Sequence, residues 1–150
     1  MEVTASSVAQ TRAFGAALAS MLRPGDVVSL SGDLGAGKTV LVQGACEALG
    51  VTARVQSPSF VLVREYRGAR MRVVHADAYR LNSLQELIDL GYEELFAPDA
   101  VLFIEWGDAV DDLLPLDRFD VRIVGQDDEP RQITARAPVD RSTALDAVGS

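Results

Sequence analysis

Cysteine and histidine are almost absent from this chain, which has one of each, Cys46 and His75, among its 150 residues. A single cysteine excludes an intramolecular disulfide, and two soft ligands are too few for a structural zinc site. Long apolar runs are also missing, since no stretch approaches the roughly 18 residues that a membrane span requires. The first residues lack the apolar core of an export signal. We therefore expect a cytoplasmic protein that does not enter the membrane.

Positive charge is scarce as well. The 14 Lys and Arg residues face 22 Asp and Glu residues, which gives a formal net charge of -8 at pH 7. Nucleic-acid binding gains most of its affinity when Lys and Arg neutralise phosphates, so unaided binding to RNA or DNA is disfavoured. Apolar residues, in contrast, make up 48% of the chain, which is enough to bury one core. We expect residues 1–150 to form a single domain.

Helical spacing of apolar residues alternates with strand-like apolar runs along the sequence. The expected elements are a helix over residues 7–23, a strand over 26–31, a helix over 39–50, paired strands over 60–66 and 71–77, a helix over 83–91, a buried strand over 100–105, and paired strands over 118–124 and 131–137. This order predicts a three-layer α/β fold with a mostly parallel central sheet and antiparallel hairpin strands. Residues 140–150 show no clear pattern and are expected to be loose.

The octet "GDLGAGKT", residues 32–39, is the strongest motif in the chain. It matches G-x-x-x-x-G-K-[ST], and it lies between an expected strand and an expected helix, as the phosphate-binding loop of P-loop NTPases does. In such a loop the backbone N–H groups and the helix dipole bind phosphate, and the lysine bridges the β- and γ-phosphates. The residues expected to contact the nucleotide here are Asp33, Leu34, Gly35, Ala36, Gly37, Lys38, Thr39 and Val40.

A carboxylate follows the buried strand "AVLFIE" at Glu105. P-loop sites hold Mg²⁺ with the hydroxyl of the loop and an acid at the end of a second buried strand. We therefore expect Thr39 and Glu105 to bind Mg²⁺ together.

Four blocks of sequence in matching order resemble the TsaE family, also called YjeE. They are "LSGDLGAGKT" from Leu30, "VQSPSF" from Val55, "HADAYRL" from His75, and "IEW" from Ile104 to Trp106. The resemblance covers about half of the chain. It implies a bacterial P-loop ATPase that is required for threonylcarbamoyladenosine (t6A) formation on tRNA.

The resemblance also implies roles for individual residues. Ser59 lies in a switch-like loop near the γ-phosphate, Asp77 points toward the nucleotide, and Glu105 is the Walker B acid. Lys38, Asp77 and Glu105 are therefore the expected catalytic residues, with Ser59 and Trp106 added to the nucleotide contacts.

Three positions depart from the pattern of the family. Ser59 replaces the usual Thr and keeps its hydroxyl, whereas Val40 replaces a second Thr and removes a hydroxyl near the α-phosphate. Gly107 replaces the usual Pro and is expected to loosen the turn after Trp106.

Family membership would make this chain the ATP-driven partner of the TsaB and TsaD proteins, which transfer the threonylcarbamoyl group to tRNA adenosine. Its ATPase would be Mg²⁺-dependent, slow alone and stimulated by these partners, and it would meet tRNA only through them. Two other functions stay open from the residues alone: a small-molecule kinase, and a nucleotide-sensing module without useful turnover. No N-K-x-D motif for guanine is present.

Other conspicuous residues allow two interpretations each. His75 is either a general base or a same-face neighbour that orients Asp77, because strand residues two apart share a face. Asp77 is either functional or paired with Arg80 in a structural salt bridge. Cys46 is expected in the core, and the acidic residues 126–130 are expected to form a solvated turn.

Overall fold

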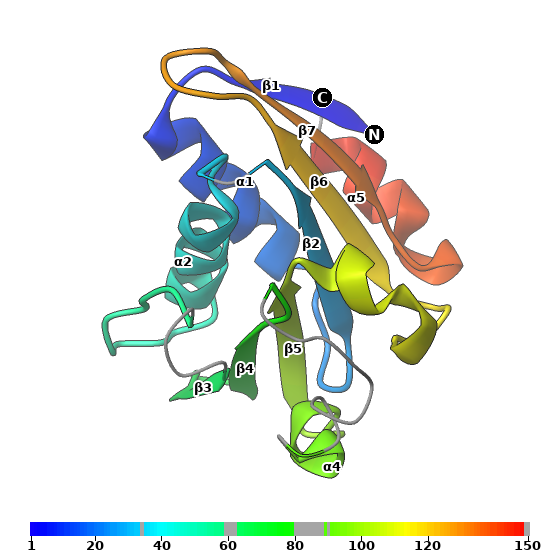
Figure 1. Cartoon of the computed structure of the whole chain (residues 1–150). Helices are drawn as coiled ribbons and strands as arrows, with labels where there is room; N and C mark the ends of the chain where they lie inside the picture. The colour runs from blue at the N-terminus through cyan, green and yellow to red at the C-terminus, as the bar shows by residue number, and fades with distance from the viewer. Residues whose placement is uncertain (34, 59–62, 80–88, 90, 149–150) are drawn as a thin grey trace.

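The computed structural model describes residues 1–33, 35–58, 63–79, 89 and 91–148, which build a twisted sheet of seven strands (Figure 1). The strand order across the sheet is β1-β7-β6-β2-β5-β4-β3. The strands are β1 Glu2–Ala5, β2 Val27–Gly32, β3 Val63–Arg67, β4 Arg72–Asp77, β5 Ala100–Glu105, β6 Phe119–Val124 and β7 Arg131–Arg136.

The centre of the sheet is parallel. Strand β2 pairs in parallel with both β5 and β6, and β5 pairs in parallel with β4. The hairpins β3–β4 and β6–β7 add antiparallel strands at each side, and β1 pairs antiparallel with β7 at the edge. The mostly parallel sheet with antiparallel hairpins, predicted from the sequence, is confirmed. All six residues of β5 are buried, as a continuous apolar run predicts for a central parallel strand.

The helices form the outer layers. They are α1 Val8–Ala19, α2 Lys38–Ala48, α4 Tyr92–Leu95 and α5 Ser142–Val148, with the 3-10 helices η1 Gly107–Leu113 and η2 Val139–Arg141. Helix α1 begins as predicted, because the Ser7 hydroxyl accepts a hydrogen bond from the Gln10 N–H at 3.1 Å. Helices α1 and α2 lie side by side in Figure 1.

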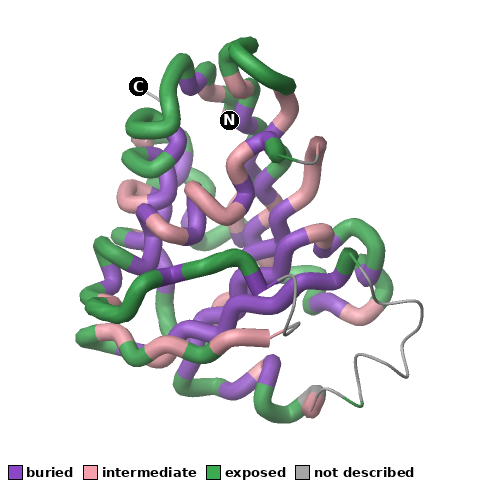
Figure 2. Tube along the Cα trace, turned by 60° about the vertical axis from the view of Figure 1, so that its left-hand side comes forward, coloured by how far each residue is buried: buried purple, intermediate pink, exposed green. Residues whose placement is uncertain are grey.

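Each face of the sheet buries its own apolar cluster. Helices α1, α2 and α5 cover one face, where Phe14, Leu41 and Leu145 pack with the sheet residues Phe103 and Phe119. On the other face η1 and α4 cover a smaller cluster that includes Val110, Leu95, Leu102 and Ile104. In Figure 2 the buried positions lie mainly in the interior of the molecule, whereas the exposed positions lie mainly at its periphery. Among the described residues, no helix is long and apolar enough to cross a membrane.

Five short elements were not predicted from the sequence: β1, α4, η1, η2 and α5. The stretch 140–150 was expected to be loose, yet it contains α5 over Ser142–Val148. Leu145 is only 2% exposed, and Arg141 forms a largely buried ion pair with Asp26 near the start of β2. Apolar burial and this ion pair therefore hold α5 against the core, although its sequence is too short to show a clear helical spacing of apolar residues.

Two predictions fall partly on residues that the structure does not describe. Most of the helix expected over 83–91 lies outside the described residues, and so do the first three residues of the strand expected over 60–66. Strand β3 runs from Val63 to Arg67 within the described part.

Candidate functional site

The glycine-rich octet connects the end of β2 to the start of α2. Gly32 has a φ of 123°, and a Cβ there would lie 1.8 Å from the carbonyl oxygen of Ile123 on β6. Gly37 caps the N-terminus of α2 with a φ of 115°, in the left-handed region that favours glycine. The sequence therefore needs glycine at both positions to turn the chain tightly from the central strand into the helix.

Lys38 lies folded against the loop that precedes it. Its side chain is almost fully buried, and Nζ donates hydrogen bonds to the carbonyl oxygens of Gly32 at 3.2 Å and Asp33 at 2.6 Å. The same nitrogen lies 3.9 Å from the ring centroid of Trp106, which is cation–π distance. Burial lowers the pKa of Lys38, and the nearby carboxylates, Glu105 foremost, oppose that shift.

Thr39 and Glu105 meet at the ends of neighbouring elements. The Thr39 hydroxyl lies 3.1 Å and 2.9 Å from the two carboxylate oxygens of Glu105. This contact follows from the topology, because β2 and β5 are parallel neighbours whose carboxyl ends share one edge of the sheet. A hydroxyl and a carboxylate are hard oxygen donors of the kind that suit Mg²⁺, which is commonly held by one or two protein oxygens together with phosphates.

The rest of the described chain offers no competing metal centre. Among the described residues, no group of three or more His, Cys, Asp or Glu side chains is placed to hold a metal ion. The donor set therefore fits an ion shared with phosphate rather than a cage made of protein alone.

Asp77 ends β4 directly opposite Glu105 in the parallel register. It is 4% exposed, and its Oδ1 accepts a hydrogen bond from the backbone N–H of Tyr79 at 2.8 Å. Two carboxylates therefore lie on adjacent strands at the edge that carries the phosphate loop. Arg80, the alternative partner considered for Asp77, lies outside the described residues.

His75 contacts a different acid from the one that the sequence suggested. Its Nε2 lies 2.5 Å from Oε2 of Glu105, so the expectation that it orients Asp77 is corrected. The reason is the pairing of strands: a parallel neighbour brings Glu105 to the face of β4 that His75 occupies, and periodicity within β4 alone does not reveal that neighbour.

Trp106 and Tyr79 border the same edge of the sheet. Trp106 has a φ of 61°, uncommon for a residue with a side chain, and its ring lies 4.8 Å from that of Tyr79 at an interplanar angle of 42°. A Cβ at the next residue, Gly107, would lie 1.9 Å from the Ser29 hydroxyl oxygen. Gly107 therefore permits close packing of η1 against β2, and the expected loosening of this turn stays a prediction.

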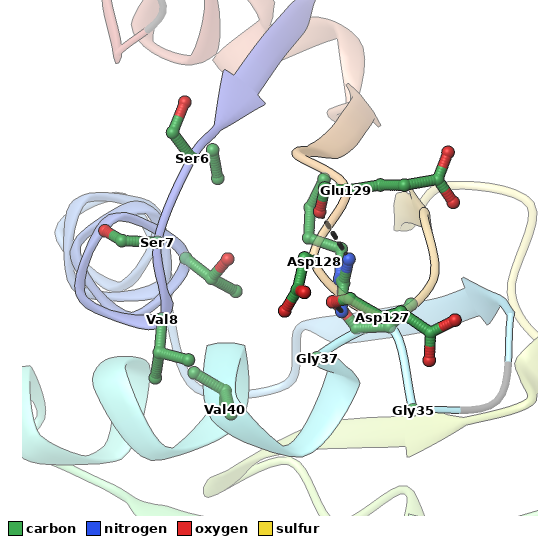
Figure 3. A pocket seen from close by; sticks show the side chains of 13 residues that line it. Ser6, Ser7, Val8, Gly35, Gly37, Val40, Asp127, Asp128 and Glu129 are labelled. Carbon is green, nitrogen blue, oxygen red and sulfur yellow. Dashed lines mark hydrogen bonds between the residues drawn. The ribbon is translucent and has the colours of Figure 1, made fainter.

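A cavity of about 280 Å³ adjoins the outer side of the phosphate loop (Figure 3). Its wall comes from three segments: residues 5–8 with Thr11 at the start of α1, the loop residues Gly35, Ala36, Gly37 and Val40, and Asp127, Asp128, Glu129 and Arg131 of the β6–β7 hairpin. Figure 3 shows the hairpin turn above the loop, facing the segment that enters α1. Several expected nucleotide contacts therefore line one cavity.

Two hydrogen bonds tie the β6–β7 hairpin to the phosphate loop. Arg131 Nε donates to the carbonyl oxygen of Ala36 at 3.0 Å, and the Gly125 N–H donates to Oδ2 of Asp33 at 3.1 Å. The turn 127–129 is exposed, as the sequence predicted, but sequence reasoning missed its place beside the loop. No local signal identifies it, because only the β2–β6 pairing brings it there.

Of the remaining predicted residues, two lie outside the described part of the chain and one lies in the core. Leu34 and Ser59 lie outside the described residues, so the structure adds nothing about them. Cys46 is fully buried in the core as predicted, and that burial raises the pKa of its thiol to about 12.

Comparison with known proteins gives one consistent family. Residues 5–133 match the family model described as "Threonylcarbamoyl adenosine biosynthesis protein TsaE". A Bacillus subtilis protein named tRNA threonylcarbamoyladenosine biosynthesis protein TsaE is 38% identical over 136 residues, which cover 91% of this chain and 85% of that protein. A Streptomyces coelicolor protein of the same name is 42% identical over 142 residues, which cover 90% of this chain and 95% of that protein.

A solved structure agrees with these relatives. The crystal structure of YdiB from Bacillus subtilis superposes with a TM-score of 0.79 at 32% sequence identity, over 98% of this chain and 91% of that one.

Proposed function

We propose that this chain, which belongs to the TsaE family of threonylcarbamoyladenosine biosynthesis, binds ATP with Mg²⁺ at its phosphate loop and hydrolyses it to support t6A formation on tRNA. One observation carries the proposal. The Thr39 hydroxyl and the Glu105 carboxylate are in contact, and both lie beside the Lys38 side chain at the end of the central strand. This is the combination that phosphoryl chemistry requires: a cation for the phosphates and oxygen donors for a metal.

The binding step uses charge and backbone together. Lys38 exchanges its contacts with the carbonyl oxygens of Gly32 and Asp33 for the β- and γ-phosphates, and the N–H groups at the start of α2 bind the phosphate oxygens. Thr39 and Glu105 would hold Mg²⁺, which supplies positive charge to the phosphates when it is bound.

The cavity beside the loop suits the base and ribose of the nucleotide. Val8 and Val40 offer apolar contact for a ring, whereas Ser6, Ser7 and the carboxylates of residues 127–129 offer hydrogen bonds. The choice of ATP rests on the family. Ser59 near the γ-phosphate and Trp106 among the nucleotide contacts stay as predicted, and the ring of Trp106 lies against Lys38.

Asp77 is the residue that we propose to orient or deprotonate the attacking water. Its burial and its position opposite Glu105 support this role, since a general base must lie within hydrogen-bond reach of the water that it activates.

We further propose that the energy drives a step in the complex of TsaB and TsaD. The net charge of -8 disfavours direct binding of tRNA, which favours an action through protein partners. A conformational change on hydrolysis, passed to those partners in the cytoplasm, fits a small switch-like NTPase.

ATP hydrolysis by the purified chain, alone and with the TsaB and TsaD proteins of the same genome, tests this proposal. We expect slow turnover alone, strong stimulation by the pair, and loss of both in Lys38→Ala. Transfer of phosphate to a metabolite would instead favour a kinase. ATP-dependent binding of the partners that is unchanged in Glu105→Gln, without turnover, would favour a nucleotide sensor.

A further inference from the structure

His75 is a fully buried polar residue in the middle of the sheet. It lies on β4 with an exposed fraction of 0%, between strands β3 and β5. Only one of its two ring nitrogens has a partner: Nε2 is 2.5 Å from Oε2 of Glu105, whereas Nδ1 has no hydrogen-bond partner within the described part of the chain.

The difference between the two ring nitrogens indicates that His75 is present for its contact with Glu105. A histidine kept only for packing in a core would ordinarily have both nitrogens satisfied, because an unpaired buried polar atom destabilises the fold. Here Nδ1 has no partner among the described residues, while Nε2 makes a short contact with a carboxylate. The ring is therefore placed for Glu105.

Glu105 also needs such a contact. It is 6% exposed, and it lies opposite another buried carboxylate, Asp77, on the neighbouring strand. A buried carboxylate requires hydrogen-bond donors, and the Thr39 hydroxyl provides one from the phosphate loop. A second donor, His75 Nε2, contacts the same Oε2 that lies 2.9 Å from the Thr39 hydroxyl, so it restricts rotation of the Glu105 side chain and keeps the carboxylate beside Thr39.

We propose that His75 is a positioning residue, which holds the Glu105 carboxylate in the orientation that binds Mg²⁺ and leaves the binding of the nucleotide itself unchanged. The proposal rests on the proposed function of the same site. It requires only that Nε2 carries a hydrogen, which is true of one neutral tautomer and of the protonated ring. Partners that orient metal ligands typically change metal affinity by about 10- to 100-fold when they are removed.

Three substitutions separate positioning from simple packing. His75→Leu removes the donor. In His75→Gln the amide nitrogen lies about as far from the backbone as Nε2 does, so it can still donate to Glu105. In His75→Asn the amide nitrogen lies only about as far out as Nδ1, so it cannot reach Glu105. Val73→Ala is the matched control, because Val73 is fully buried two residues earlier on the same face of β4 and packs only in the apolar cluster.

The readout is the fluorescence of Trp106, the only tryptophan in the chain, which lies against Lys38. MgCl2 is titrated into full-length protein with ATP at a fixed concentration, and the affinity for ATP is measured separately in EDTA. We expect His75→Leu and His75→Asn to raise the Mg²⁺ concentration at half-saturation by about tenfold or more, with the affinity in EDTA unchanged. For His75→Gln the Mg²⁺ concentration at half-saturation should lie within about threefold of the wild-type value, and for Val73→Ala it should equal the wild-type value.

The outcomes distinguish the two proposals. Wild-type protein that shows no Mg²⁺-dependent response to ATP would overturn the proposed function, and the positioning role with it. A wild-type response that His75→Leu reproduces would overturn the positioning role alone. If His75→Leu does not fold, the pair of amide variants decides: equal Mg²⁺ requirements for Gln and Asn would refute the role, and the expected difference would support it.

Discussion

Lys38 shows how strongly its surroundings act on a single side chain. The fold buries its ammonium group, which favours loss of the proton, and surrounds it with acids, which favour its retention. Because burial dominates, the pKa of Lys38 lies below the ordinary value. A partly desolvated cation binds phosphate more strongly than one in water, since the local dielectric is lower.

Removing this cation tests the phosphate site directly. Lys38→Ala should weaken ATP binding by about 10- to 100-fold, because a hydrogen bond to a charged group contributes about 1.5–3 kcal/mol. Fluorescence titration of Trp106 with ATP measures the change. Arg23→Ala is the control, since it removes one exposed positive charge whose ion-pair partner, Asp140, lies away from the loop. Equal affinities of the two variants would contradict the role of Lys38.

The lowered pKa of Lys38 also predicts a pH dependence with a definite sign. As the pH rises toward 10.5, the native protein loses this proton before the unfolded chain does. In that window the unfolded state binds more protons, so the contribution of Lys38 to the free energy of unfolding increases with pH. ATP affinity falls in the same window, because the cation is lost. Urea unfolding and ATP titrations from pH 7 upward, each compared with Lys38→Met, measure both trends; parallel trends of stability and affinity would contradict this assignment.

At the scale of elements, the crossing of α1 and α2 depends on two glycines. A Cβ at Gly15 would lie 2.0 Å from the carbonyl oxygen of Leu41, and a Cβ at Gly44 would lie 2.0 Å from that of Arg12. The two helix backbones therefore approach each other closely. This contact fixes α1 against the helix that carries Lys38 and Thr39.

Gly44→Ala should consequently lower the free energy of unfolding by about 1–3 kcal/mol, because the helices must separate to admit one methyl group. At a solvent-exposed position of a helix, a change from Gly to Ala would instead raise the free energy of unfolding by about 1 kcal/mol. Chemical unfolding followed by circular dichroism shows whether Gly44→Ala lowers or raises the free energy of unfolding. The control Ala13→Gly, at an exposed position of α1, measures helix propensity alone. A stabilised Gly44→Ala protein would show that the helices are not in close contact.

Elements whose own sequence carries a clear pattern were predicted well, whereas features that depend on contacts between elements were not. The phosphate loop and β5 carry their identity in glycines and in an unbroken apolar run, so the sequence alone places Lys38, Thr39 and Glu105 at element ends. Strand β1 has four residues, and α5 has seven, which is too short for a clear period. The contact of His75 with Glu105 arises between strands, where no pattern within one strand reports it.

At the scale of the whole molecule, the C-terminal segment completes the core over α1 and β6. Leu145 packs in the same cluster as Phe14 and Phe119, and Arg141 lies 4.9 Å above the ring of Phe119. Because this segment covers apolar residues of two elements that are far apart in the sequence, α1 and β6, its loss affects the whole fold rather than one end of it.

Leu145→Ala should therefore destabilise the protein by about 2–5 kcal/mol, the usual range for a buried leucine that leaves a cavity. Thermal and urea unfolding measure the effect. Val139→Ala serves as the control, because Val139 is 90% exposed only six positions earlier. Equal stability of the two variants would mean that α5 does not contribute to the core.

The central position of β2 also has a consequence for how the protein is made. Strand β2 ends at residue 32, but its two neighbours, β5 and β6, span residues 100–105 and 119–124. A growing chain on a ribosome therefore exposes its glycine-rich loop long before the flanking strands exist. Contacts of such wide sequence separation form slowly. The proposed nucleotide site can therefore assemble only after the residues of β6, up to Val124, have been synthesised and have left the ribosome.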